Sequence, residues 1–120
     1  MAYKDTPDPR HRLPPRRLTE TLTITTPDGH TIHLSIGYDP ADDTPRPREV
    51  FYSAGFKSGS QLEFQIQDTC VLISLLLQHG LRPAEIAKSL ARREQPDGSM
   101  AYGSITGMIA DQLVAADTAK

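Results

Sequence analysis

The chain has 120 residues, 38% of them hydrophobic, and a formal net charge of −2, which fits one small globular domain with a modest core. Its longest apolar run, around Val71–Leu77, is far shorter than the roughly 20 residues that a membrane span needs. The single cysteine, Cys70, excludes an internal disulfide and a thiolate metal cage. Because the first residues show no apolar leader, we expect a cytoplasmic protein.

The first 18 residues are basic and rich in proline. They carry a net charge of +3 and contain four prolines, a density that disfavours both helix and central strand. We therefore expect a flexible basic arm over residues 1–18 and a single domain over residues 19–120. The arm is expected to be solvated, and contact with an acidic partner or with RNA is the alternative. The negative charge of the whole chain gives no reason to expect nucleic acid.

The next segments read as strands. In TETLTITTPDGHTIHLSIGYDP, apolar and polar residues alternate on both sides of a Pro-Asp-Gly turn. This pattern predicts a β-hairpin, because proline presets the turn and glycine accepts a positive φ angle. After a proline-rich loop, REVFYSAG predicts a third strand, with Val50 and Tyr52 on one face and Phe51 on the other.

The second half of the chain reads as helices. From about Ser60 the apolar residues recur every three or four positions, which predicts one long helix that Gly80 ends. Further leucines fill the other sides of its second half, so we expect that part to be buried on nearly all sides. A second helix is expected from Pro83 through the following SLARRE, and a third within SITGMIADQLVAAD. The inward stripe of the long helix is expected to hold Leu62, Ile66, Cys70, Ile73 and Leu77.

Strands followed by helices predict an α+β fold. We expect a small antiparallel three-stranded sheet, formed by the hairpin and the third strand, packed by one long and two shorter helices. Nothing in the sequence forms a self-contained catalytic or metal-binding set. The four histidines are expected in structural or solvent-exposed positions, and Cys70 as a buried, inert thiol. The pair Asp42 and Asp43 lies in a loop without a third ligand in view. We therefore expect no catalytic residue, metal or cofactor.

The turn GFKSGS, between the third strand and the long helix, is the one candidate binding site. Ser58 and Ser60 can each cap the helix, and Gly59 allows a tight backbone. Lys57 adds a positive charge near the positive end of the helix, so the turn could hold an anion or a nucleotide. The alternative is a plain strand-to-helix corner with a serine cap. Both interpretations remain open at this point.

Four segments between residues 46 and 90 resemble the TSCPD domain: RPREVF, GFKSGS, ISLLLQHGL and PAEIAKSL. A weaker echo follows in GSITGMIADQL. That domain is found near the C-terminus of adenosylcobalamin-dependent ribonucleotide reductases and as stand-alone small proteins. The resemblance therefore implies a module related to ribonucleotide reductase and to the synthesis of deoxyribonucleotides for DNA.

The chain departs from the family pattern in its cysteines. The cysteine that gives the family its name falls near Ser104–Gly107, where this chain has none. Cys70 alone cannot shuttle electrons, because dithiol exchange needs two thiols. A chain of 120 residues also has no room for a catalytic barrel of about 250 residues. A ribonucleoside-diphosphate reductase label would therefore rest on the shared domain, and we expect the isolated chain not to be an enzyme.

These observations predict a stand-alone TSCPD-like accessory module that binds a partner. The expected partner is a ribonucleotide reductase subunit or another nucleotide-metabolism protein, and the apolar half of the long helix also predicts a homodimer. Two alternatives remain. One is a component supplied in trans to a ribonucleoside-diphosphate reductase. The other is a small anion- or nucleotide-binding domain built on Lys57–Ser60.

Overall fold

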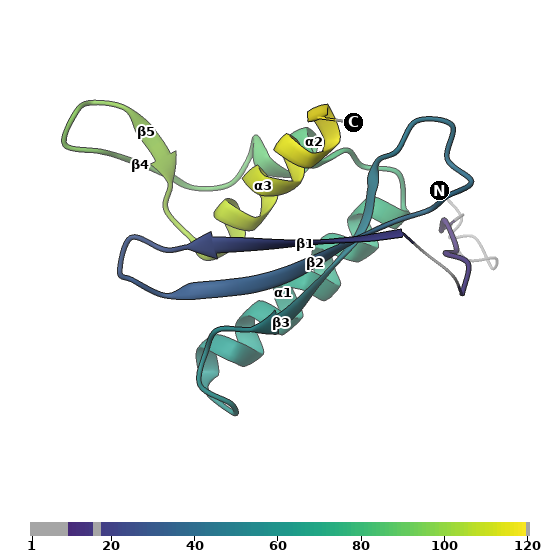
Figure 1. The fold of residues 1–120 in the computed structure, drawn as a ribbon. Coiled ribbons are helices and arrows are strands. Elements are labelled where there is room, and N and C mark those ends of the chain that lie inside the picture. Colours follow the sequence, from purple (N-terminus) through teal and green to yellow (C-terminus); the bar gives the residue numbers. More distant parts are fainter. Residues whose placement is uncertain (1–9, 16–17, 120) are drawn as a thin grey trace, which may run out of the picture.

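A computed structural model describes residues 10–15 and 18–119, with side chains in the last helix up to residue 117. It confirms the α+β fold: a three-stranded antiparallel sheet is packed by one long and two shorter helices (Figure 1). A small two-stranded ribbon adds to the predicted elements. In chain order the elements are β1 (Leu18–Thr25), β2 (Thr31–Tyr38), β3 (Pro47–Ala54), α1 (Gln61–Gln78), α2 (Pro83–Ala87), β4 (Arg92–Glu94), β5 (Met100–Tyr102) and α3 (Ile105–Ala119).

The main sheet has the strand order β1-β2-β3, and β2 lies in the middle. β1 and β2 pair over their full length without a register shift. The turn between them is the predicted one: Gly29 has φ +94° and its N–H donates to the carbonyl of Thr26 at 3.0 Å. A glycine in this left-handed position closes a three-residue hairpin loop, so the Pro-Asp-Gly signal was sufficient to place the hairpin.

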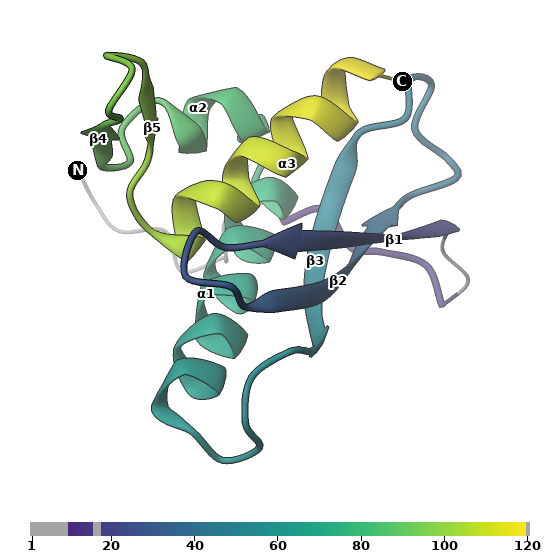
Figure 2. The same cartoon turned by 60° about the vertical axis from the view of Figure 1, so that its left-hand side comes forward.

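One face of the sheet carries the core. Val50 is 1% exposed on this face, whereas Phe51 is 44% exposed on the other, as the alternation in β3 predicts. Helices α1 and α3 contribute to the same buried cluster as this face (Figure 2). The largest buried apolar side chains of that cluster are Ile32, Leu34, Ile36, Val50, Leu77, Ile109 and Leu113.

Helix α1 begins and ends where the sequence indicates. Ser60 caps its start, and Gly80 follows its end with φ +102°. The N–H of Leu81 donates to the carbonyl of Leu76, and that of Gly80 to the carbonyl of Leu77, both at 3.1 Å. These two bonds form a Schellman motif, which satisfies the last carbonyls of the helix. None of the described helices, α1 included, is long and apolar enough to cross a membrane.

The burial predicted for α1 is correct on its inward side and wrong on its outer side. Ile66, Cys70, Ile73 and Leu77 are buried, but Leu62 is 42% exposed. The second half was expected to be buried on nearly all sides. Among the described residues no layer covers its far side, so several large apolar residues face outward. The exposed apolar residues of α1 beyond Leu62 are Phe64, Val71, Leu72 and Leu76.

The segment after Pro83 also differs from the prediction. The helix there ends at Ala87, and β4 and β5 form an antiparallel ribbon instead of a helical continuation. The ribbon turns at Pro-Asp-Gly, the same tripeptide as in the first hairpin, with Gly98 at φ +86°. The turn signal was therefore present. Because the strands are three residues long and mostly exposed, they lack the alternating apolar pattern that marks a strand.

Candidate functional site

The turn Lys57–Ser60 joins β3 to α1 and is held by the helix itself. Ser60 Oγ accepts a hydrogen bond from the N–H of Glu63 at 3.2 Å. In return, Glu63 Oε1 accepts one from the N–H of Gly59 at 2.9 Å. This reciprocal arrangement is a variant of the capping box, in which the carboxylate reaches the residue before the cap. The serine cap that the sequence predicts is thus present at Ser60.

The same geometry bears on anion binding at the turn. Lys57 and Ser58 are exposed and stand beside the start of an 18-residue helix. However, the carboxylate of Glu63 already accepts the N–H of Gly59, one of the donors that an anion would use. An external anion would have to compete with this resident carboxylate. The four predicted residues therefore lie together, but the carboxylate of Glu63 occupies part of the position that an anion would take.

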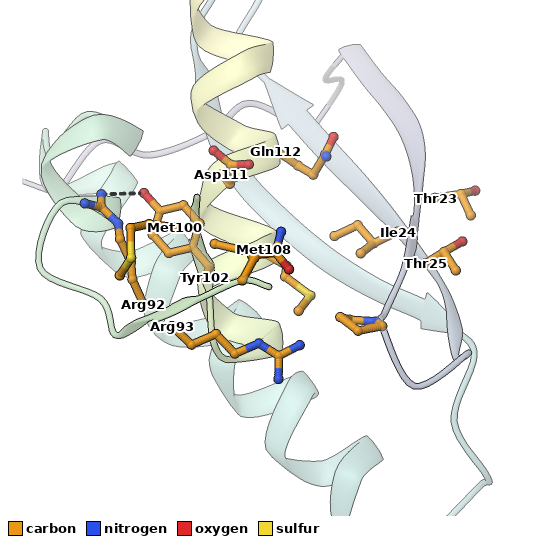
Figure 3. A pocket seen from close by; sticks show the side chains of 13 residues that line it. Thr23, Ile24, Thr25, Arg92, Arg93, Met100, Tyr102, Met108, Asp111 and Gln112 are labelled. Atoms are coloured by element: carbon orange, nitrogen blue, oxygen red, sulfur yellow. Dashed lines mark hydrogen bonds between the residues drawn. The ribbon is translucent and has the colours of Figure 1, made fainter. Parts of the chain in front are cut away.

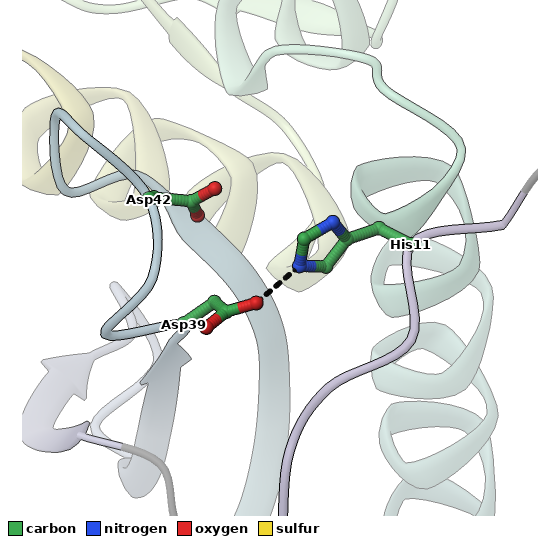
Figure 4. Close-up of side chains that lie close together, drawn as sticks. All are labelled: His11, Asp39 and Asp42. Atoms are coloured by element: carbon green, nitrogen blue, oxygen red, sulfur yellow. Dashed lines mark hydrogen bonds and ion pairs between the residues drawn. The ribbon is translucent and has the colours of Figure 1, made fainter.

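The structure brings together three side chains that the sequence does not connect: His11, Asp39 and Asp42 (Figure 4). One ligand atom from each lies within 4.8 Å of the others. His11 Nε2 lies 2.5 Å from Asp39 Oδ2. The two oxygens of Asp42 accept hydrogen bonds from Nε and Nη2 of Arg48, each at 2.9 Å. Histidine nitrogens and carboxylate oxygens are metal ligands, so the cluster is a candidate metal site.

The hydrogen bonds of this cluster favour a charge network over a metal centre. The backbone N–H of Ala41 and the ring of His11 lower the pKa of Asp39, and Arg48 lowers the pKa of Asp42. Both carboxylates are therefore stabilised as anions by protein groups. A divalent cation would have to displace the bidentate Arg48 from Asp42. The residues could approach a metal only by breaking that pair.

The network anchors the described part of the N-terminal arm to the domain. The N–H of His11 donates to the Gln78 carbonyl at 2.7 Å, and Arg10 Nε donates to Gln78 Oε1 at 2.6 Å. Together with the pair between His11 and Asp39, these bonds hold residues 10–15 near the end of α1. Residues 1–9 and 16–17, also part of the predicted arm, lie outside the described residues.

A cleft of about 480 Å³ lies between the outer edge of β1, the β4–β5 ribbon and α3 (Figure 3). In its wall, the guanidinium of Arg92 stands 4.9 Å from the ring centroid of Tyr102 and donates to the Tyr102 hydroxyl at 3.0 Å. The cleft could not be predicted from the sequence, because the strands of the ribbon carry no apolar alternation. Its lining includes Thr23, Ile24, Thr25, Arg92, Arg93, Met100, Tyr102, Met108 and Asp111.

The second feature that the structure reveals is the outer face of α1, defined by Phe64, Val71, Leu72 and Leu76. Their exposed fractions are 50%, 57%, 62% and 40%. They lie on sides of the helix turned away from its buried stripe. A group of large exposed apolar side chains on one helix is typical of a protein–protein contact.

Comparison with known proteins gives one finding. The model of the TSCPD domain family matches residues 1–116, almost the whole chain. The match therefore includes the N-terminal hairpin, which the resembling segments between residues 46 and 90 do not reach. No curated protein and no solved structure matches the chain.

Proposed function

The chain belongs to the TSCPD domain family, and from this premise we propose that it is an accessory module that binds a partner protein and performs no catalysis alone. The observation that carries the proposal is the outer face of α1. Val71 and Leu72 are each more than half exposed on a helix whose opposite side is fixed in the core. Burying such a face against a partner removes apolar surface from water at roughly 25 cal/mol per Å².

The state of the single thiol supports a role without catalysis. Cys70 is 3% exposed, and burial raises the pKa of its thiol to about 12. A reactive or electron-carrying cysteine needs access and a substantial thiolate fraction near neutral pH, and this thiol has neither.

The family resemblance points to the partner. TSCPD domains accompany adenosylcobalamin-dependent ribonucleotide reductases, so the proposed partner is a ribonucleotide reductase subunit in the cytoplasm. The module would act in trans, in deoxyribonucleotide synthesis. A second copy of the chain is the other candidate for the same face, and it would give a species of twice the chain mass in sedimentation.

Binding of the purified chain to the ribonucleotide reductase of the same organism tests this proposal. We expect Leu72→Glu to abolish binding, because it places a charge in an apolar contact. Phe51→Glu is the matched control: Phe51 is also exposed and apolar, but it lies on the open face of the sheet. Equal binding of both variants, or no binding of the wild-type chain, would contradict the proposal. Ribonucleotide reduction by the chain alone would contradict its non-catalytic part.

We propose anion or nucleotide binding at Lys57–Ser60 as a second candidate function. Its support is the exposed Lys57 and Ser58 beside the start of α1. Phosphate or a nucleotide should then raise the melting temperature, and Lys57→Ala should remove that shift. Lys88→Ala is the control, since Lys88 is also exposed and lies at the end of another helix. A nucleotide panel without any shift would count against this site.

A further inference from the structure

The two edges of the main sheet differ in how their backbone is satisfied. At β3, side chains of α1 cover the edge. Ser74 Oγ accepts from the N–H of Val50 at 2.9 Å and donates to the carbonyl of Val50 at 3.1 Å. One turn later, Gln78 Nε2 donates to the carbonyl of Arg48 at 3.2 Å. This edge is therefore closed to another strand at Arg48 and Val50.

At β1 the corresponding groups are open. The N–H of Thr26 donates to the carbonyl of His30 at 2.8 Å, so the pair that closes the hairpin is hydrogen-bonded. Because bonding alternates along an antiparallel pair, every second residue of β1 then directs its N–H and C=O away from β2. Within the described part of the chain, no hydrogen bond reaches these outward backbone groups. The residues that carry them are Thr19, Thr21, Thr23 and Thr25.

β1 also has little of the usual protection of an edge strand, since Glu20 is its one charged residue. It is eight residues long, contains no proline or lysine, and pairs with β2 without a bulge. Such an edge is a template for main-chain pairing with another extended segment. An open edge strand carries a risk of aggregation. The open edge of β1 is therefore a candidate binding surface.

The cleft lies along this open edge. Thr23 and Thr25 line it on one side, and the β4–β5 ribbon lines the other. Its volume of about 480 Å³ is within the range of sites that bind ligands. Arg92 and Arg93 supply two positive charges to the lining, against the single carboxylate of Asp111. The lining therefore favours an occupant with negative charge.

We propose that this cleft binds an extended acidic peptide segment, which adds to β1 as a further strand of the sheet. The backbone of the segment pairs with the outward groups of Thr23 and Thr25. Its acidic side chains contact Arg92 and Arg93. The inference rests on the proposed function only in requiring a partner. It uses a surface separate from the outer face of α1, so the two can fail independently.

Fluorescence anisotropy with the full chain tests the site. The probe is a labelled peptide of alternating Glu and Thr, about ten residues long, the length of one strand. A Lys-Thr peptide of the same pattern should bind at least about tenfold more weakly. A Glu-Thr peptide that is N-methylated at every second residue should not bind, because it lacks the backbone N–H groups that would donate to the outward carbonyls of β1. Equal binding of the methylated peptide, or no binding of the parent peptide, would overturn the proposal.

Variants of the chain locate the binding. Thr23→Pro removes an outward N–H without touching the ladder to β2, and Arg93→Glu reverses one charge. Each should weaken the Glu-Thr peptide by about tenfold or more. Thr19→Pro, on the same edge beyond the cleft, and Lys88→Glu are the controls and should bind normally.

Two further results separate binding in the cleft from binding at the outer face of α1, and a peptide from a nucleotide. Leu72→Glu should bind the peptide like wild type, so loss of reductase binding in that variant leaves the cleft unaffected. A nucleotide that binds the cleft while the peptide does not would overturn the peptide assignment. So would wild-type affinity in both Thr23→Pro and Arg93→Glu.

Discussion

The hydroxyl of Ser74 bonds to both backbone groups of Val50, accepting from its N–H at 2.9 Å and donating to its carbonyl at 3.1 Å. In the apolar run of α1, Ser74 and Gln78 are the polar residues that face the edge of β3. Their spacing of one helical turn matches the spacing of the outward groups in the strand. The two residues thus fix helix and sheet in one register.

Ser74→Ala should lower the free energy of unfolding by about 1–3 kcal/mol, because it leaves backbone groups of a buried residue without a partner. Urea denaturation followed by circular dichroism measures this loss. Ser58→Ala is the control, since Ser58 is exposed, and should change stability by less than about 0.5 kcal/mol. Equal stability of the two variants would show that α1 does not need this contact.

Gly55→Ala and Gly59→Ala should differ although both glycines have positive φ angles, +138° and +77°. A Cβ at Gly55 would overlap the carbonyl oxygen of Thr31 and lie 2.8 Å from Cα of Ile32. At Gly59 no atom lies within 4 Å of the added carbon. We expect Gly59→Ala to cost about 1 kcal/mol of backbone strain, and Gly55→Ala clearly more. Thermal denaturation gives the order, and a reversed order would contradict the close approach of Gly55 to β2.

The thiol of Cys70 should react with a disulfide reagent at pH 8 only as fast as the protein unfolds. Burial raises its pKa from the ordinary 9.0 to about 12, so the folded chain keeps it protonated. The associated stability is complete below pH 9 and is lost as the pH rises from 9 toward 12, because the unfolded chain releases the proton first. Labelling rates with and without urea provide the measurement. Fast labelling of the native chain would refute the burial.

Asp39→Asn should release residues 10–15 from the domain, because it removes the charge that pairs with His11. Trypsin should then cleave after Arg12 faster than in the wild type. Asp43→Asn, an exposed carboxylate in the same loop, is the control and should leave the rate unchanged.

The wild-type contact should also weaken in acid. The pKa of Asp39 is lowered by the N–H of Ala41 and by His11, so its contribution is present above the ordinary pKa of 3.8. It is lost as the pH falls through the lower value of the folded state. If trypsin cleaves Asp39→Asn and the wild type after Arg12 at the same rate, contacts other than the pair of His11 and Asp39 hold residues 10–15.

The parts of the fold that could be predicted depend on local signals. The first hairpin follows from alternation around Pro-Asp-Gly. The end of α1 follows from Gly80, because a glycine with a positive φ angle ends a helix through hydrogen bonds to its last turn. The ribbon carries the same tripeptide but no apolar alternation, so its strands could not be recognised.

The parts of the site that could not be predicted depend on distant contacts. His11 and Asp39 are 28 positions apart, and neither has a neighbour in sequence that indicates the pair. The cleft is lined by β1, the ribbon and α3, which are far apart in the sequence. The inward stripe of α1 could be predicted from its helical spacing, but the apolar residues on its other sides also suggested burial, and the sequence does not show that they face outward.

The buried position of Cys70 makes the chain convenient for site-directed labelling. Because it is the single cysteine of the sequence and its thiol is shielded, a cysteine introduced at an exposed site would be the one reactive thiol of the folded protein. Leu72→Cys and Thr23→Cys would therefore carry a spin label or a fluorophore without any change at Cys70. Paired with a labelled reductase or peptide, each would report occupancy of one surface while the other stays unmodified.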